Sequence, residues 1–160
     1  MAALGTFDGG EGRDVLRLFF SEDAEGAGMP DVINFRGVTQ RLNNDHGLLT
    51  GIEEINFGGG SRQDKLVLNV ADVMSLLSTS QNHHLLISAS ETPTSGQNNL
   101  FYVYDGGGSI NLKDYGFASA PTQTIAEPGV PNAYVYTHMA TGYQLIVDSR
   151  ITNADNLAHA

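Results

Sequence analysis

The sequence predicts a mostly-β fold, a β-sandwich or β-roll-like domain with Gly-rich turns and one short helix. Its 19 glycines gather in clusters such as Gly58-Gly59-Gly60 and Gly106-Gly107-Gly108. The runs between these clusters are short, and they alternate polar with apolar residues or are apolar throughout, as strands do. One run has the periodicity of an amphipathic helix. We therefore expect short strands joined by glycine-rich turns, forming a single domain over residues 1–160.

Nine runs along the chain are expected to be strands. In Ser109–Leu112 polar and apolar residues alternate, which is typical of a half-buried strand, whereas Leu100–Tyr104 is apolar throughout and is expected to be buried on both faces. The nine runs are Val15–Phe20, Val32–Phe35, Ile52–Phe57, Leu66–Val70, Leu85–Ser90, Leu100–Tyr104, Ser109–Leu112, Ala133–Thr137 and Tyr143–Asp148.

The helix is expected over Asn69–Ser78, where Val70, Val73, Met74 and Leu77 share one face. Asn69 can cap it, with Asp72 near its positive N-terminal end. Further on, three prolines predict that Ala118–Asn132 is a long loop.

The charge of the chain excludes several partners. There are 18 acidic and 8 basic residues, a net charge of −10. This argues against nucleic acid and anionic membrane surfaces, and suits either cation binding or plain solubility. Residues 1–31 alone hold seven acidic and two basic residues. No apolar run approaches the roughly 20 residues that span a bilayer, so no membrane insertion is expected. The absence of cysteine excludes disulfides, thiolate metal sites and a cysteine nucleophile.

The residues from Gly9 to Arg17 match the nonapeptide Gly-Gly-x-Gly-x-Asp-x-U-x, where U is a large apolar residue, at every fixed position. Calcium prefers six to eight oxygen ligands, which such a turn supplies from backbone carbonyls and a carboxylate. Gly9, Glu11 and Asp14 are therefore candidate calcium ligands, although an ordinary glycine-rich turn remains an alternative. One such turn supplies only about half of the oxygen ligands that a calcium ion needs.

A second turn must therefore face the nonapeptide. The best candidate is Gly59–Asp64, which adds Gly59 and Asp64 to the expected ligands; Asp105–Gly108 is a second candidate, or else a hairpin turn. Gly9–Leu18 and Gly59–Leu68 also agree in register at five positions, which suggests a repeat. The acidic cluster of Glu22, Asp23, Glu25 and Asp31 is either a second calcium loop or a solvated loop.

With these motifs in order, the chain resembles the domain near the C-terminal end of large RTX (repeats-in-toxin) adhesins and biofilm-associated surface proteins of Gram-negative bacteria. The resemblance spans Phe7 to Asn153. Four segments carry it in sequence: Gly9–Leu18, Ile52–Gly59, Leu66–Met74 and Tyr134–Asp148.

This resemblance implies type I secretion, a secreted or cell-surface location and folding in the presence of Ca²⁺. Residues Met1–Phe7 lack the features of a secretory signal, so we expect any export signal elsewhere in a longer parent chain. The implied partners are a peptide or glycan ligand on a host or neighbouring cell, and neighbouring domains of a larger adhesin.

Two acidic neighbours on an expected strand are further candidates. Glu53 and Glu54 must point to opposite faces, and an inward carboxylate is costly unless it is paired or bound to metal. The resemblance favours Glu53 as the one that meets an ion, and the solvent-facing one is expected to have no role. The tyrosines are expected in the core or in cross-strand pairs, with an aromatic ligand platform as the alternative.

The expected role is non-enzymatic cell adhesion, either as a ligand-binding module or as a structural spacer. There is no Gly-x-Ser-x-Gly elbow and no His-Glu-x-x-His motif, so no catalytic residue is assigned. The alternative is a polysaccharide-acting β-fold enzyme, which would need two carboxylates roughly 5–10 Å apart in a cleft.

Overall fold

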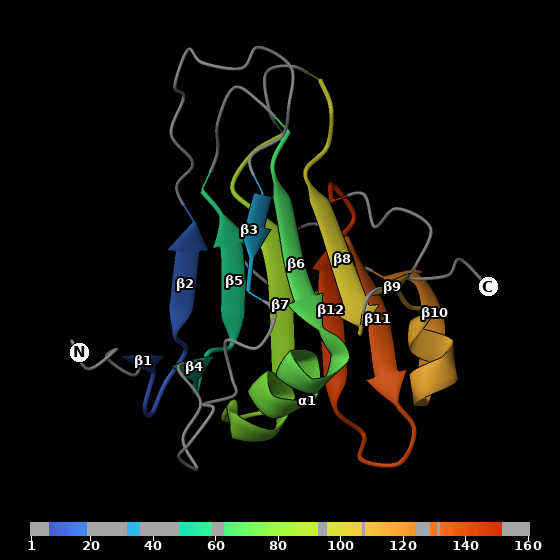
Figure 1. The fold of residues 1–160 in the computed structure, drawn as a ribbon. Coiled ribbons are helices and arrows are strands. Elements are labelled where there is room, and N and C mark those ends of the chain that lie inside the picture. Colours follow the sequence, from blue (N-terminus) through green and yellow to red (C-terminus); the bar gives the residue numbers. More distant parts are fainter. Residues whose placement is uncertain are drawn as a thin grey trace.

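The computed structural model describes residues 7–18, 32–35, 49–58, 63–92, 96–106, 108–123, 129–130 and 132–151. The prediction of a mostly-β chain with one short α-helix is confirmed for these residues (Figure 1). Its elements are β1 (Phe7–Asp8), β2 (Val15–Leu18), β3 (Val32–Asn34), β4 (Leu49–Thr50), β5 (Glu54–Phe57), β6 (Lys65–Asn69), α1 (Val70–Thr79), β7 (His84–Ala89), β8 (Leu100–Asp105), β9 (Gly108–Ser109), the 3₁₀ helix η1 (Leu112–Tyr115), β10 (Phe117–Gln123), β11 (Ala133–His138) and β12 (Gln144–Asp148).

The chain coils through two sheets that face each other. The larger sheet has the order β10-β11-β12-β7-β5-β2, and the smaller sheet has the order β3-β6-β8-β9. The chain passes from β2 to β3, from β5 to β6 and from β7 to β8, and each strand pairs in parallel with its counterpart in the next passage. We call these passages the first coil (β1–β3), the second coil (β4–β6) and the third coil (α1–β8).

The C-terminal part closes one side of this stack. Strands β10, β11 and β12 form antiparallel pairs, and β12 pairs in parallel with β7 of the third coil. The third coil is therefore covered in the larger sheet by a further strand.

The core lies between the two sheets. Because side chains alternate across a strand, every second residue of each strand points into this space. Eight inward side chains of the second and third coils are fully buried: Ile55, Phe57, Leu66, Leu68, Leu85, Ile87, Phe101 and Val103.

Helix α1 lies at one end of the space between the sheets and buries Val73, Leu76 and Leu77 (Figure 1). The predicted cap is confirmed: the Asn69 side chain accepts a hydrogen bond from the Asp72 amide at 2.9 Å, and the Asp72 carboxylate accepts one from the Asn69 amide at 3.1 Å. Of the helices that the structure describes, none is long and apolar enough to cross a membrane.

The structure corrects the loop expected over Ala118–Asn132. Residues 117–123 form β10, which lies at the edge of the larger sheet with a register irregularity between Ser119 and Thr122. Proline lacks an amide proton, but an edge strand needs pairing on one side only, so Pro121 is tolerated there. The remaining described residues of this stretch are Gly129, Val130 and Asn132.

Three other expectations are also resolved. The strand expected at Ser109–Leu112 is only two residues long as β9, and the chain then turns into η1. The hairpin alternative at Asp105–Gly108 is confirmed, since β8 and β9 pair across it. Strand β8 is not buried on both faces: Phe101 and Val103 point inward, whereas Leu100, Tyr102 and Tyr104 stay partly exposed.

The two similar segments, Gly9–Leu18 and Gly59–Leu68, do not occupy equivalent places. Strand β2 of the first lies in the larger sheet, and β6 of the second lies in the smaller sheet. The true counterpart of β2 is β5, which pairs with it from Val15↔Glu54 to Leu18↔Phe57. Similar turn-and-strand patterns therefore arose at two different corners of the coil.

Candidate functional site

The nonapeptide forms the turn between β1 and β2, and it stacks on the turn between β4 and β5 in the second coil. The Gly9 amide donates to the Thr50 carbonyl at 3.0 Å. The Asp14 carbonyl accepts from the amides of Glu53 and Glu54, both at 3.1 Å. Two turns from successive coils therefore lie against each other, as a shared ion site between turns requires.

The fixed positions of the nonapeptide require glycine for different reasons, each of which concerns the backbone. A Cβ on Gly9 would lie 2.0 Å from the Gly51 carbonyl oxygen and 2.8 Å from Cγ of Asp14, so no side chain fits there. Gly10 and Gly12 face open space, but their φ angles of +80° and +119° favour glycine. Gly9 is thus required by the stacking of the two turns, and Gly10 and Gly12 by the local backbone conformation, whether or not an ion is bound.

The carboxylate of Asp14 is the unusual group in this turn. It packs over Gly9, and its Oδ2 is buried without a hydrogen-bond partner among the described residues. Asp8 lies close by and accepts a hydrogen bond from the Gly10 amide at 3.2 Å. Glu11 is exposed. A buried polar atom without a partner costs on the order of 1–3 kcal/mol, more when it is charged, and a bound cation would offset that cost.

Glu53 is buried, and both of its oxygens accept backbone hydrogen bonds. Oε2 accepts from the Asp14 amide and Oε1 from the Gln81 amide, each at 2.8 Å. Asp14 belongs to the first coil and Gln81 to the third, so one carboxylate ties three successive turns together. These hydrogen bonds give Glu53 a structural role that needs no ion. Coordination of a calcium ion by Glu53 stays a prediction.

The facing turn expected at Gly59–Asp64 lies elsewhere. Gly59 is outside the described residues. Asp64 is buried at the start of β6, where its amide donates to Asn99 Oδ1 at 2.9 Å. It follows the C-terminal end of β5, whereas Asp14 pairs with the residues at the N-terminal end of β5. The two aspartates therefore lie at opposite ends of the coil, and the turn that faces Asp14 is Gly51–Glu53.

The sequence offered one signal for this facing turn. Gly51 has a φ of +61° and is buried, but it stands alone and belongs to no recognisable motif. Among the described residues, no group of three or more His, Asp or Glu side chains is arranged to hold a metal ion. A cation at this turn would therefore depend on backbone carbonyls as well as carboxylates.

A small cavity of about 170 Å³ adjoins the nonapeptide turn. Leu86 and Ile146 contribute its apolar lining, and polar residues from three turns contribute the rest. The lining residues in the described part of the chain are Gly12, Arg13, Glu53, Gln81, Asn82, His84, Leu86 and Ile146. Glu53 is the one carboxylate among these lining residues, and its oxygens already accept two amides.

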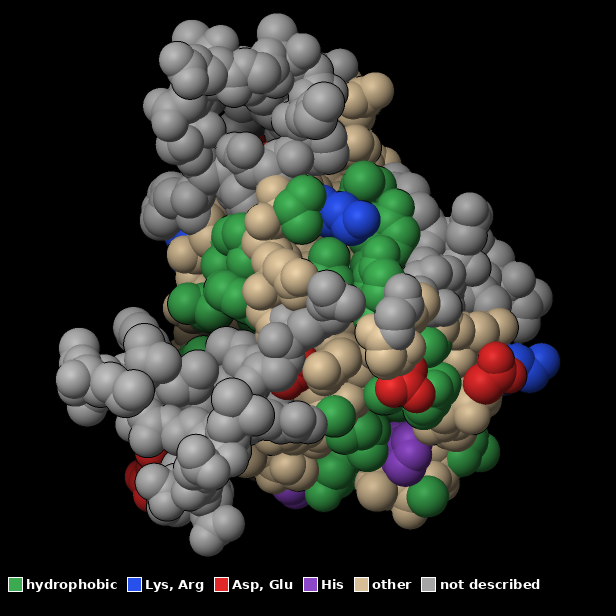
Figure 2. Space-filling model, in the orientation of Figure 1, with side chains coloured by type: hydrophobic (Ala, Val, Ile, Leu, Met, Phe, Trp, Pro, Cys, Tyr) green, Lys and Arg blue, Asp and Glu red, His purple; other side chains and the backbone are tan. Residues whose placement is uncertain are grey.

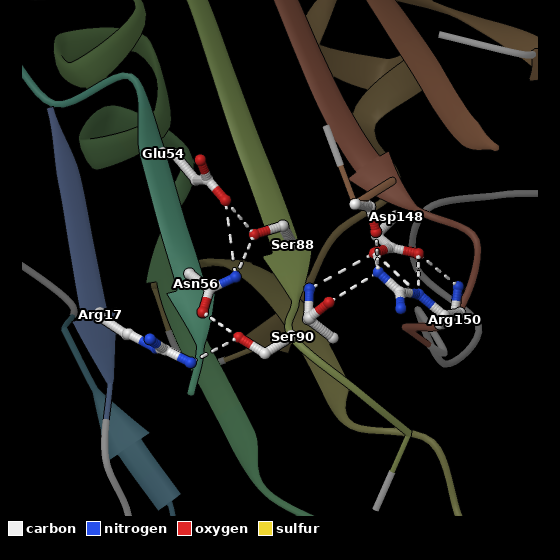
Figure 3. A network of polar contacts seen from close by, with 9 residues as sticks. Arg17, Glu54, Asn56, Ser88, Ser90, Asp148 and Arg150 are labelled. Atoms are coloured by element: carbon white, nitrogen blue, oxygen red, sulfur yellow. Dashed lines mark hydrogen bonds and ion pairs between the residues drawn. The ribbon is translucent and has the colours of Figure 1, made fainter. Parts of the chain in front are cut away.

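The outer face of the larger sheet carries a polar network that corrects the expectation for Glu54 (Figure 3). Glu54 is buried, pairs with Arg13 at 2.7 Å and accepts a hydrogen bond from Ser88. Asn56 donates to Ser88 at 2.7 Å and accepts from Ser90 at 2.9 Å. The outward carboxylate of Glu54 therefore connects β5 to the turn before β2 and to β7, so the expectation that it has no role is wrong.

A second ion pair lies further along the same sheet, at the end of β12 (Figure 3). Asp148 is fully buried, and Arg150 approaches it at 2.6 Å and also donates to the carbonyls of Ala89 and Gly129, both at 2.6 Å. The hydrogen bond to Asp148 raises the pKa of Arg150. This pair joins β7 and β12 to the chain around Gly129.

Two tyrosines lie on the outer face of the smaller sheet. Figure 2 shows hydrophobic side chains gathered over this sheet beside a basic side chain. Tyr102 and Tyr104 have ring centroids 6.3 Å apart, and the Lys65 ammonium lies 4.2 Å from the Tyr102 centroid. They form a same-strand pair covered in part by a cation.

Comparison of the chain with protein-family models, with curated proteins and with solved structures found no match. The stacked turns and the adjoining cavity are therefore the features from which function can be inferred.

Proposed function

We propose that this chain is a non-enzymatic, calcium-stabilised module of an RTX-type adhesin. The observation that supports this best is the Asp14 carboxylate, whose Oδ2 is buried without a hydrogen-bond partner among the residues that the structure describes, in a turn that stacks on Gly51–Glu53. The coiling of parallel strands through two sheets is consistent with the β-roll alternative of the expected fold, in which turns of successive coils share calcium ions.

The oxygen donors at this turn suit calcium. Asp14 and Asp8 supply carboxylates, and the stacked turns supply backbone carbonyls, all of them hard ligands that calcium prefers. The Arg13 guanidinium in the same turn pairs with Glu54 at 2.7 Å. A bound Ca²⁺ would offset the repulsion between the acidic groups and fix the first coil on the second.

Such a module would act outside the cell, where calcium is plentiful. We propose a secreted or cell-surface location, export by type I secretion, and a structural role beside neighbouring domains of a larger adhesin. Folding would then be coupled to export, because the calcium that stabilises the folded state is bound only after the chain leaves the cell.

A second role is favoured by the cavity next to the nonapeptide turn. Gly12 and Arg13 belong to that turn and also line the cavity, so a calcium ion would order one of its walls. Polar groups over an apolar floor suit a sugar unit or a short peptide segment. Binding of such a ligand would be lost with a chelator and restored by calcium.

The test is thermal unfolding with chelator and with millimolar calcium. Calcium at about a hundredfold excess over Kd stabilises the folded state by about 2.7 kcal/mol, which for a chain of this size raises Tm by about 5–10 °C. Asp14→Asn should remove most of this increase. In chelator the same variant should be neutral or slightly stabilising, because the buried unpartnered oxygen loses its charge.

Asp114→Asn is the matched control, since it removes one negative charge from an exposed residue of η1. It should leave the calcium-dependent increase unchanged. If calcium does not move the melting curve of the unaltered protein, the calcium proposal is wrong. A screen of peptides and glycans, run beside hydrolase assays, then separates a binding module from a spacer or an enzyme.

A further inference from the structure

The turn that follows helix α1 presents two polar side chains at the cavity beside the nonapeptide turn. The His83 amide donates to the Ser80 carbonyl at 3.2 Å, which makes Gln81 and Asn82 the central residues of this turn. Both are exposed, and both line the cavity together with His84. Within the described part of the chain, no hydrogen bond engages the side chains of Gln81, Asn82 and His84. These three groups can therefore bind a ligand without giving up a contact in the protein.

His83 fixes this turn through a backbone conformation that is rare for its residue type. Its φ is +54°, the only positive value among the described residues other than glycine. Its Nδ1 donates to the Leu77 carbonyl of α1 at 3.0 Å, and its ring stacks on Tyr143 with the ring centroids 4.5 Å apart. Its carbonyl accepts the Gln144 amide at 3.0 Å. Backbone strain of this kind persists only where the surroundings hold it, and it is concentrated at ligand-binding and active sites.

The floor of the cavity is apolar, and the cavity has room for one small ring. Leu86 and Ile146 lie opposite each other in β7 and β12, and both are buried. At about 170 Å³ the cavity is smaller than the roughly 300–1,000 Å³ of sites that hold drug-sized ligands. A small ring with an apolar face and polar edges suits this shape, because its face can lie on the two aliphatic side chains while its edges meet the turn.

The polar side chains at the rim match a ligand that carries neighbouring hydroxyl groups. A carboxamide has a donor and an acceptor side by side, and a hydroxyl group can donate and accept as well. Each of Gln81 and Asn82 can therefore bind two adjacent hydroxyls of one ring. An extended peptide is less well matched, because it binds mainly through its backbone at the edge of a sheet, whereas this cavity lies over a sheet face.

The charges around the cavity oppose an anionic ligand. Arg13 and Glu53 are the formally charged residues of the described lining, and Arg13 pairs with Glu54 at 2.7 Å. The two carboxylates outnumber the one guanidinium, and the whole chain carries −10. A neutral ligand is therefore favoured over an acidic one of the same shape.

We propose, building on the ligand-binding role given under the proposed function, that the cavity binds one neutral hexopyranose unit, such as the terminal sugar of a glycan. The C–H face of the ring would lie on Leu86 and Ile146, and its hydroxyl groups would bind Gln81, Asn82 and His84. Because His83 already holds the turn in place, little ordering is needed on binding.

NMR titration of the whole isotope-labelled chain tests this ligand class. The probes are the methyl glycosides of glucose, galactose and mannose, with galacturonate as the acidic comparison and a neutral blocked tripeptide as the peptide comparison, each in chelator and in calcium. We expect at least one neutral glycoside to shift the amide signals of Gly12, Gln81 and Asn82, with a Kd on the order of 1 mM for so small a ligand. Galacturonate and the tripeptide should bind roughly tenfold more weakly or worse.

Variants then test the residues. Gln81→Ala combined with Asn82→Ala removes both carboxamides but keeps the Gln81 amide that Glu53 accepts, so it should weaken binding by roughly tenfold or more and leave Tm unchanged. His83→Gly allows the same backbone conformation but loses the ring contacts, and should weaken binding by about threefold. Lys113→Ala, exposed on η1 outside the cavity, is the control and should leave Kd unchanged.

Binding of a neutral glycoside that the double variant loses, in calcium or in chelator, supports the proposal. Three results would overturn it: no shift with any neutral glycoside at tens of millimolar, equal binding by the double variant, or tighter binding of galacturonate or the tripeptide. A tripeptide that binds best would refute the sugar class alone and leave a ligand-binding module. The calcium role is decided separately by the melting curves, so its failure is distinguishable from a failure of sugar binding.

Discussion

Replacement of Glu53 by Gln tests whether this buried carboxylate holds the turns together or holds an ion. In the structure its two oxygens accept the amides of Asp14 and Gln81 at 2.8 Å. Gln keeps one acceptor oxygen and presents an NH₂ group to the other amide, so one hydrogen bond is lost and two donors oppose each other.

The size of the effect follows from those two bonds. A hydrogen bond to a charged group contributes about 1.5–3 kcal/mol, and both amides are only partly buried, which favours the lower part of that range. We expect Glu53→Gln to lower the free energy of unfolding by about 2 kcal/mol and Tm by about 4–8 °C. Glu11→Gln, in the same turn but exposed, is the control and should change stability by less than about 0.5 kcal/mol.

Urea unfolding of both variants, in chelator and in calcium, distinguishes the two roles. If Glu53 binds the amides, the loss is the same in both conditions. If Glu53 is instead a calcium ligand, stability is lost only when calcium is present. A Glu53→Gln protein as stable as the unaltered one in chelator would refute the structural role.

Two further predictions concern single groups. Arg150→Met leaves the buried Asp148 carboxylate without its cation, so we expect a loss of about 3–5 kcal/mol, measured by urea unfolding, and partial recovery when Asp148→Asn is added. Gly9→Ala forces a Cβ against the Gly51 carbonyl oxygen and should cost about 2–3 kcal/mol, whereas Gly10→Ala, with open space but positive φ, should cost about 1 kcal/mol by the same measurement. Equal losses in the two glycine variants would contradict the close contact at Gly9.

Strands and helix were predictable where the local pattern agrees with the final burial. The helix from Val70 to Thr79 is such a case, because its cap at Asn69 and its apolar face are both local features. The edge strand β10 was missed because Pro121 is an ordinary strand breaker, and only its place at a sheet edge makes it acceptable. The apolar run of β8 also did not reveal that its tyrosines remain partly exposed, because their exposure depends on which face of the sheet is covered in the folded chain.

The candidate site was predictable on one side only. The nonapeptide identifies the turn from Gly9 to Asp14, and the backbone geometry of the structure explains why each of its glycines is needed. The partner turn was expected at Gly59–Asp64, because that segment has a similar pattern. Asp64 lies at the other end of β5, and the turn that stacks on the nonapeptide contains the single Gly51.

The sequence by itself determined the class of the fold, the positions of most strands, the capped helix and the presence of an acidic glycine-rich turn, because each of these depends on residues close together in the chain. Only the tertiary structure decided which turns stack, since stacking depends on the path of the chain through two sheets. Segments of unequal length, which contain strands and the helix, separate Val15, Glu54 and Leu86, which are nonetheless neighbours in one register. That register puts the carboxylate of Glu53 between the amides of Asp14 and Gln81, and no spacing in the sequence encodes it.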